Sequence, residues 1–169
     1  MDKSYPERKP NRLKGYNYSQ NGIYFLTICT KDKNCILGRI VGGGDLDAPK
    51  MMLSEYGIIT EKYIQSVNQS YRHISVMNYV VMPNHIHLIV ELYSDENVFC
   101  DETTSSPANG DIPVMVSALK KLINKEIGIN IWQRSYHDHI IRNEESFNTI
   151  WEYVEENPVR WEKDCFYCD

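Results

Sequence analysis

Two apolar runs with a short polar break between them stand in the middle of the chain. Residues 76–82 and 85–92 are rich in Val, Ile and Leu, and a Pro-Asn pair separates them. Branched apolar residues favour β-strands, and so short a break allows only a tight antiparallel hairpin. The second run opens with His85 and His87. Because alternate residues of a strand point to the same face, both imidazoles are predicted to project side by side.

The hydrophobic period also predicts the other elements. Helical segments repeat their apolar residues every three to four positions, whereas strand segments are rich in β-branched and aromatic residues. The order β, α, β-β, α, β, α is the ferredoxin-like pattern. We therefore expect an α+β fold, an antiparallel sheet with helices packed on one face and the other face free for a ligand or a second subunit. Strands are predicted at 22–30, within 35–41 and within 129–141, and helices at 54–69, 114–127 and 144–156.

The length of 169 residues suits one domain with its own core. Residues 1–21 are basic and polar and contain two prolines, which predicts an arm rather than a helix. Residues 93–113 are acidic and carry Ser, Thr, Pro and Gly without periodicity, which predicts a flexible loop. No apolar run approaches about 20 residues and no signal peptide is recognisable, so we expect a cytoplasmic protein without a membrane span.

Charge is distributed unevenly along the chain. The formal net charge is −5, but residues 91–111 hold six acidic residues and no basic one, so the remainder sums to +1. This balance argues against a nonspecific nucleic-acid binder and still permits a local phosphate-binding face. The basic residues that would form such a face cluster around Arg12 and Lys14 and around Lys120 and Lys121.

The five cysteines predict free thiols. Their number is odd, and the chain shows no export signal, so we expect them to be reduced. Cys165 and Cys168 form a lone C-x-x-C pair. Without a second pair, this spacing is weak evidence for zinc.

Four of the five histidines form two His-x-His pairs, His85 with His87 and His137 with His139. A pair supplies only two ligands, and a metal site needs more. Asp138 would point to the opposite face of a strand and cannot easily complete the second pair. From spacing alone, each pair is either a packing feature or part of a metal site.

The last predicted helix carries a second candidate set. Tyr153 and Asn157 are four residues apart and therefore share a face. A tyrosine hydroxyl is a possible nucleophile, and an asparagine carbonyl is a possible metal ligand. Helix spacing equally fits a core aromatic beside Trp151 and a helix cap before Pro158.

The combination of these motifs resembles the REP-associated tyrosine transposases, a group of the HUH single-tyrosine nucleases. Met-Pro-Asn-His-Ile-His ends at His87, and Tyr-x-x-x-Asn-Pro begins at Tyr153. The two motifs together are specific to that family, and the resemblance covers nearly the whole chain except the acidic loop. The matching segments, in family order, are residues 12–19, 24–30, 81–87, 131–134, 139–143 and 153–159.

The resemblance implies a ferredoxin-like HUH fold, usually a homodimer, that acts on single-stranded or hairpin DNA. By the same resemblance, His85 and His87 bind a divalent metal, Tyr153 is the nucleophile and Asn157 is a third ligand. The implied metal is Mg²⁺ or Mn²⁺, and imidazole ligands favour Mn²⁺ of the two. Four basic residues are expected to contact DNA, namely Arg12, Lys14, Lys120 and Lys121.

The implied chemistry is cleavage and rejoining of a DNA strand. A tyrosine with a pKa of about 10 is a poor nucleophile at neutral pH, so a metal that offsets phosphate charge is needed. Attack by Tyr153 would give a 5′-phosphotyrosine and a free 3′-hydroxyl. Two alternatives stay open at this point. One is a hairpin-binding protein without turnover, favoured by the acidic balance, and the other is a nuclease that uses water and leaves Tyr153 structural.

Overall fold

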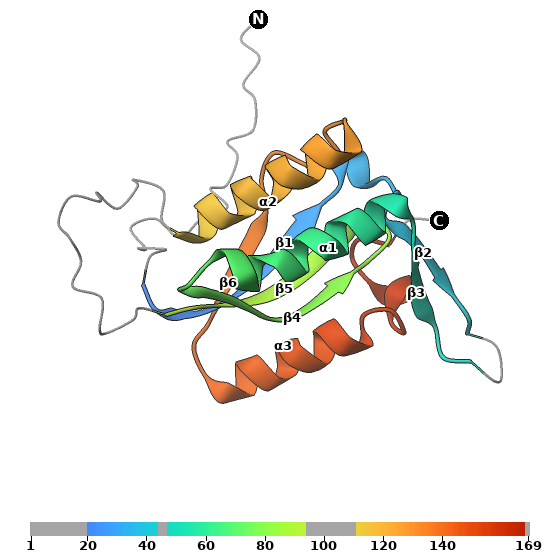
Figure 1. The fold of residues 1–169 in the computed structure, drawn as a ribbon. Coiled ribbons are helices and arrows are strands. Elements are labelled where there is room, and N and C mark those ends of the chain that lie inside the picture. Colours follow the sequence, from blue (N-terminus) through green and yellow to red (C-terminus); the bar gives the residue numbers. More distant parts are fainter. Residues whose placement is uncertain (1–19, 44–46, 94–110, 168–169) are drawn as a thin grey trace, which may run out of the picture.

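The computed structural model describes residues 20–43, 47–93 and 111–167 (Figure 1). Most of the predicted basic arm and of the predicted acidic loop therefore lies outside the described residues, together with Arg12, Lys14 and Cys168. The described part contains six strands and three α-helices. They are β1 (Gly22–Cys29), β2 (Gly38–Val41), β3 (Lys50–Leu53), α1 (Glu55–Ser70), β4 (Ile74–Val81), β5 (His85–Leu92), α2 (Asp111–Ile127), β6 (His137–Ile141) and α3 (Glu144–Glu156).

Four of the strands form one antiparallel sheet in the order β4-β5-β1-β6. This confirms the predicted α+β fold, and β4 and β5 form the predicted hairpin. The central pair is β5 with β1, in a register that places His85 opposite Cys29 and His87 opposite Thr27. Every side chain of β5 except Glu91 is buried, because the strand is covered on both faces.

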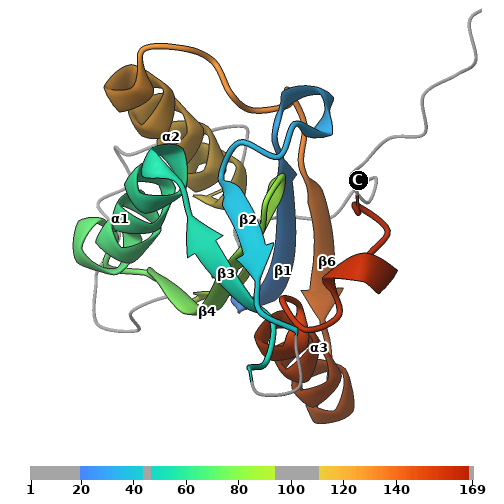
Figure 2. The same ribbon diagram turned by 90° about the vertical axis from the view of Figure 1, so that its right-hand side faces the viewer.

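The two faces of the sheet are covered by different helices. Helices α1 and α2 pack over the main core on one face, whereas α3 lies on the opposite face (Figures 1 and 2). There Val154 of α3 packs with Ile89 of β5 and Ile141 of β6. The prediction that the helices pack on one face is therefore wrong for α3. Its apolar stripe buries a second cluster that the strand pattern alone does not reveal.

A further hairpin, β2 with β3, extends from one end of the sheet (Figure 2). The sequence predicts only a possible strand within 35–41. The predicted strand region at 129–141 also shortens to β6, preceded by a single bridge between Thr30 and Trp132. Cys29 and Cys165 are free, but Cys35 is disulfide-bonded, so the prediction of reduced thiols is wrong for Cys35.

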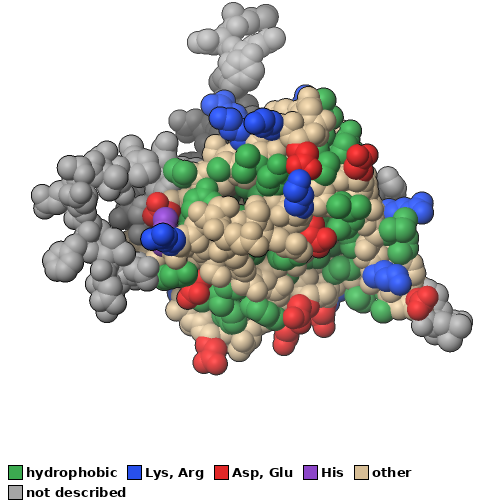
Figure 3. Space-filling model, viewed as in Figure 1, with side chains coloured by type: hydrophobic (Ala, Val, Ile, Leu, Met, Phe, Trp, Pro, Cys, Tyr) green, Lys and Arg blue, Asp and Glu red, His purple; other side chains and the backbone are tan. Residues whose placement is uncertain are grey.

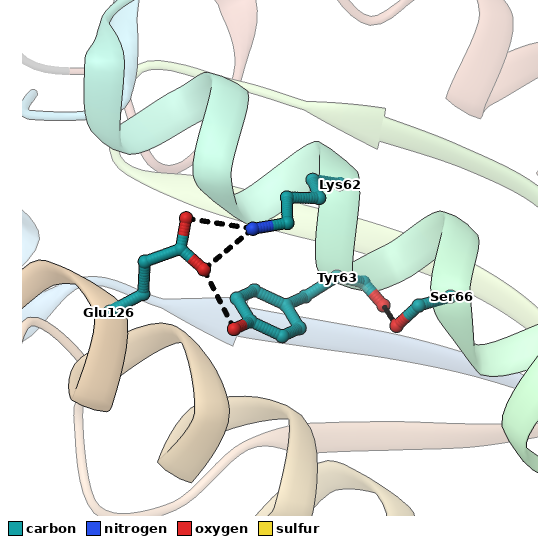
Figure 4. A network of polar contacts seen from close by, with 4 residues as sticks. All are labelled: Lys62, Tyr63, Ser66 and Glu126. Atoms are coloured by element: carbon teal, nitrogen blue, oxygen red, sulfur yellow. Dashed lines mark hydrogen bonds and ion pairs between the residues drawn. The ribbon is translucent and has the colours of Figure 1, made fainter.

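Polar groups fix the helices in place. Ser54 caps α1 by accepting from the Gly57 amide, as the sequence predicts. Between α1 and α2, the Lys62 Nζ donates to both oxygens of Glu126 at 2.7 and 2.8 Å, and the Tyr63 hydroxyl donates to one of them at 2.7 Å (Figure 4). These groups are largely exposed, so the contact orients the two helices more than it stabilises them. None of the helices in the described part of the chain has the length and apolar character of a membrane span.

Gly57 is where α1 approaches the backbone most closely. A Cβ at this position would lie within hard contact of the Leu37 carbonyl oxygen, an atom that also accepts from the Ser54 amide. Alanine is normally better than glycine in a helix by about 1 kcal/mol. Here we expect Gly57→Ala to lower the free energy of unfolding by about 1–3 kcal/mol, because the backbone must shift. Urea denaturation measures this change.

Gly22→Ala is the matched control for that experiment. A Cβ at Gly22 makes only ordinary contacts with the Tyr24 ring. Its urea midpoint should stay close to that of the parent. An unfolding free energy for Gly57→Ala equal to that of the parent would contradict the close approach of α1 to Leu37.

Candidate active site

Two buried imidazoles face each other at the start of β5. His85 and His87 are 0% and 1% exposed, and their Nε2 atoms lie 3.0 Å apart. Each Nδ1 has its own partner, Asn84 Oδ1 at 2.8 Å for His85 and Thr27 Oγ1 at 2.9 Å for His87. The strand periodicity therefore does place both rings on one face, as the sequence predicts.

The hydrogen bonds of Asn84 determine which nitrogen of His85 carries the proton. The Asn84 Nδ2 donates to the carbonyl oxygens of Lys33 and Phe166, so Oδ1 is the atom that faces His85. An amide oxygen only accepts, and the Nδ1 of His85 must therefore be the donor. The Thr27 hydroxyl can donate to the Nδ1 of His87 or accept from it, so this contact does not fix the tautomer of His87. The neutral His85 ring therefore has its lone pair on Nε2, and that atom faces the Nε2 of His87.

Burial keeps both rings neutral. It lowers the pKa of His85 to about 4, against the opposing effect of the nearby Asp164 carboxylate. It also lowers the pKa of His87 well below its usual range, and the neighbouring His85 adds to this effect. Neutral imidazole is the form that binds metal ions. Both side chains are thus held in the state of a ligand at neutral pH.

A carboxylate completes the cluster. Ligand atoms of His85, His87 and Asp164 all lie within 4.8 Å of one another. Asp164 follows the short helix Trp161–Lys163, and the Phe166 amide donates to its Oδ1 at 2.7 Å. Sequence analysis missed Asp164, because the chain after α3 has no motif that points back to the histidines.

Tyr153 and Asn157 reach the cluster from α3. The Tyr153 hydroxyl donates to Asp164 Oδ2 at 2.9 Å and lies 3.3 Å from His87 Nε2. The Asn157 Nδ2 donates to the same carboxylate oxygen at 3.1 Å, and Asn157 is 1% exposed. Burial and the hydrogen bond to Asp164 both raise the pKa of the Tyr153 hydroxyl. The structure thus brings together all four residues that the two sequence motifs single out.

Aromatic rings enclose the histidines. Phe25 is stacked on His87 with ring centroids 4.9 Å apart, and Phe166 lies 4.7 Å from the His85 ring. Trp161 lies 6.0 Å from the same ring. These contacts restrict the rotamers of both imidazoles and keep bulk water away from them.

The donor set fits a divalent metal ion. The two Nε2 atoms lie 3.0 Å apart, and this distance equals that of two adjacent ligands each about 2.1 Å from one ion at a right angle. The Oδ1 of Asn157 is buried and has no hydrogen-bond partner among the described residues, so it is a further available donor. Imidazole together with oxygen donors suits Mn²⁺ better than Mg²⁺. Whether Asn157 is a ligand stays a prediction.

The other sequence candidates lie elsewhere. His137 and His139 are exposed on the edge strand β6 and do not belong to the cluster. Lys121 is exposed on α2, whereas Lys120 is half-buried and donates to the carbonyl oxygens of Gln133 and Ser135. Burial lowers the pKa of Lys120 to about 8, so this side chain is less available for a phosphate than its charge suggests.

Comparison with known proteins finds relatives in sequence and in fold. No protein-family model matches the sequence. An uncharacterised protein of Haemophilus influenzae is 32% identical over 96% of this chain and 94% of its own length. A second protein of that organism, designated a REP-associated tyrosine transposase, is 21% identical over 85% of this chain and 74% of its own length. A solved structure of a REP-associated tyrosine transposase bound to a REP hairpin has a TM-score of 0.60 and 20% identity, and covers 88% of this chain and 73% of that one.

The fold is that of a solved REP-associated tyrosine transposase, and this chain carries its His-x-His motif on the central strand of the sheet. In sequence, too, the chain is similar to a protein designated a REP-associated tyrosine transposase. The structural likeness establishes the shared fold. The resemblance at the site rests on the two sequence motifs that contain His87 and Tyr153.

Metal binding tests the assembled cluster. We expect Mn²⁺ to bind the full chain, and Asp164→Ala and His87→Ala each to weaken that binding by more than about tenfold, because each removes a donor of the cluster. Electron paramagnetic resonance of free Mn²⁺ measures the affinity.

His139→Ala is the control, since this exposed histidine lies outside the cluster. Equal Mn²⁺ affinity for Asp164→Ala and His139→Ala would show that Asp164 is not a ligand. Asn157→Ala in the same series determines whether the buried amide oxygen contributes.

Proposed function

We propose that this protein is a metal-dependent single-stranded DNA endonuclease and transposase that cleaves and rejoins DNA at hairpin-forming repeats through a 5′-phosphotyrosine. One observation carries the proposal. The hydroxyl of Tyr153 lies 3.3 Å from the ligand nitrogen of His87, within reach of a phosphate bound at the histidine pair. A half-buried tyrosine in a merely structural role does not need to meet a cluster of metal-ligand atoms.

The residues of the site suit each part of this reaction. The Tyr153 oxygen attacks phosphorus, and its proton passes to Asp164 Oδ2, which already accepts the hydroxyl hydrogen bond. The bond from phosphorus to the 3′-oxygen breaks, and that oxygen leaves as a hydroxyl after taking a proton from water. The proton held by Asp164 then returns to that water, so no net proton is gained or lost. The new phosphotyrosine ester retains the phosphodiester energy, so the reverse reaction rejoins a strand without ATP.

A divalent metal bound by His85, His87 and Asp164 would supply charge that offsets the phosphate and favours the tyrosinate. The protein itself contributes preorganisation. Thr27 and Asn84 hold the imidazoles, and Asn157 holds the carboxylate. Because the raised pKa keeps Tyr153 protonated on its own, cleavage should depend strictly on the metal.

The structure offers a surface for the DNA backbone. Figure 3 shows Lys and Arg side chains together at the top of the molecule, over α2. A groove there is lined by Lys120, Lys121 and Arg134, with Ser117 and Tyr136 between them. No acidic side chain is among its described lining residues. The likeness to a transposase that holds a REP hairpin supports a hairpin as the ligand of this groove.

Tyr153 and the histidine pair meet within one chain. The homodimer implied by the resemblance is therefore not required to complete the site, and it stays a prediction. The cytoplasmic location expected from the sequence also stays a prediction. A hairpin-binding protein without turnover is the second candidate, and the net charge of −5 favours it, since repulsion weakens binding to other DNA.

Covalent capture tests the proposed chemistry. The chain incubated with labelled hairpin DNA and Mn²⁺ should form an adduct that survives denaturation. In Tyr153→Phe, the amount of adduct should fall by at least about a thousandfold. The nucleophilic oxygen is then absent, while the ring still packs against Phe25. Gel electrophoresis under denaturing conditions measures the amount of covalent adduct.

Tyr71→Phe is the control, because Tyr71 lies at the end of α1 and outside the site. Binding without any adduct in the parent chain would support the hairpin-binding candidate instead. Cleavage without an adduct, unaffected by Tyr153→Phe, would point to a nuclease that uses water.

The basic groove makes a separate prediction about binding. Lys121→Ala and Arg134→Ala should each weaken hairpin binding and reduce the slope of log affinity against log salt by about 1, since each removes one phosphate contact. Fluorescence anisotropy over a salt series measures both quantities. Lys125→Ala, one turn further along α2 and outside the groove, should leave the slope unchanged. Unchanged slopes for Lys121 and Arg134 would place the DNA on another surface.

A further inference from the structure

A second groove lies between β2 and the segment that follows α3. Its volume is about 540 Å³, within the range of ligand sites. None of the residues assigned above to the metal, the nucleophile or the basic groove lines it. The residues that matter for its chemistry are Arg39, Gly42, Gly43, Trp161, Tyr167 and one acidic residue, Glu162.

The groove is the neighbour of the histidine pair. The Trp161 ring lies 6.0 Å from the His85 ring on one side and 5.4 Å from the Tyr167 ring on the other. Pro83, two residues before His85, also lines the groove. A DNA strand with one nucleotide at the histidines would therefore have its next nucleotide close to the opening of this groove.

The walls of the groove combine an aromatic face, a cation and bare backbone. Tyr167 is 41% exposed, and Arg39 is exposed on β2. Gly42 and Gly43 have φ of 90° and 99°, a conformation that glycine adopts without strain, and they present backbone in place of side chains. A flat base stacks on tyrosine, and a phosphate pairs with guanidinium.

We propose that this groove binds one unpaired nucleotide next to the phosphate that Tyr153 attacks. The base stacks on Tyr167, and Arg39 pairs with the phosphate of that nucleotide. The inference rests on the proposed function and deepens it, because the groove then selects the base beside the cleavage point. The groove has one guanidinium, one carboxylate at Glu162, one exposed tyrosine ring and a position one ring beyond His85. With Arg39 on the phosphate, Glu162 is left as an acceptor for an amino group of the base, a combination that fits one nucleotide better than a peptide or a second copy of the chain.

The stacking is tested in the Tyr153→Phe chain with Mn²⁺, so that no strand is cleaved. The probe is a short single-stranded DNA of mixed sequence with 2-aminopurine at its centre, whose fluorescence falls on stacking. In this background, Tyr167→Ala should weaken binding by about fivefold or more and restore the fluorescence. Tyr167→Phe keeps the ring and should bind as the parent does.

Tyr93→Ala is the matched control for the ring. Tyr93 follows β5 at the end opposite His85 and is 38% exposed. It should change neither the affinity nor the fluorescence. Equal binding and equal quenching for Tyr167→Ala and the parent would overturn the proposed stacking.

The phosphate contact is tested by Arg39→Ala, which should weaken binding of the same probe and lower its salt slope by about 0.7. Arg39→Lys should restore the slope. Arg72→Ala is the control, because Arg72 is exposed between α1 and β4, away from the groove. A salt slope for Arg39→Ala equal to that of Arg72→Ala would overturn the contact.

The two proposals fail separately. If the parent chain forms the Tyr153 adduct while the Arg39 and Tyr167 variants bind as their controls do, the nucleotide site is wrong and the cleavage chemistry stands. If no adduct forms but these variants lose binding of the probe, the nucleotide site stands and the cleavage chemistry is wrong. Circular dichroism melting of each variant confirms that the fold is retained.

Discussion

The site depends on two neutral imidazoles that face each other inside the protein. The Nε2 atoms of His85 and His87 lie 3.0 Å apart, and burial keeps both rings neutral. Buried polar atoms are costly unless each has a partner, so the contacts of both rings matter. Thr27 and Asn84 prevent the rings from turning away. The surrounding structure thus holds the two Nε2 atoms at the spacing of two ligands of one cation.

The rest of the fold supplies what this pair lacks. The register of β1 against β5 brings Thr27 opposite His87, and α3 crosses the same sheet face with Tyr153. The segment after α3 then returns over His85, where Asn84 holds it by the Phe166 carbonyl. Asp164 on this segment receives hydrogen bonds from Tyr153 and Asn157. Tyrosine, carboxylate and histidines therefore come from three parts of the chain that meet at one end of the sheet.

Local charge matters more here than net charge. The chain as a whole is acidic, yet the groove along α2 has three cations and the groove beside Trp161 has an exposed arginine. For the proposed DNA ligand, such a charge distribution would favour discrimination by shape, since only a ligand that fits the grooves overcomes the general repulsion. The solved transposase of similar fold is bound to a REP hairpin.

Much of this architecture could be predicted from sequence. Alternation placed His85 and His87 on one face, and helical spacing placed Tyr153 with Asn157, because both patterns depend only on neighbours along the chain. The antiparallel sheet and the bounds of β5 and α3 followed from the same local periods. Tertiary structure decided the side of the sheet on which α3 packs, the partners of each Nδ1, and the approach of Asp164 from beyond the last helix. These features arise from register and packing between segments up to about 80 residues apart, as in the bond from Asn84 to Phe166, and no local pattern encodes them.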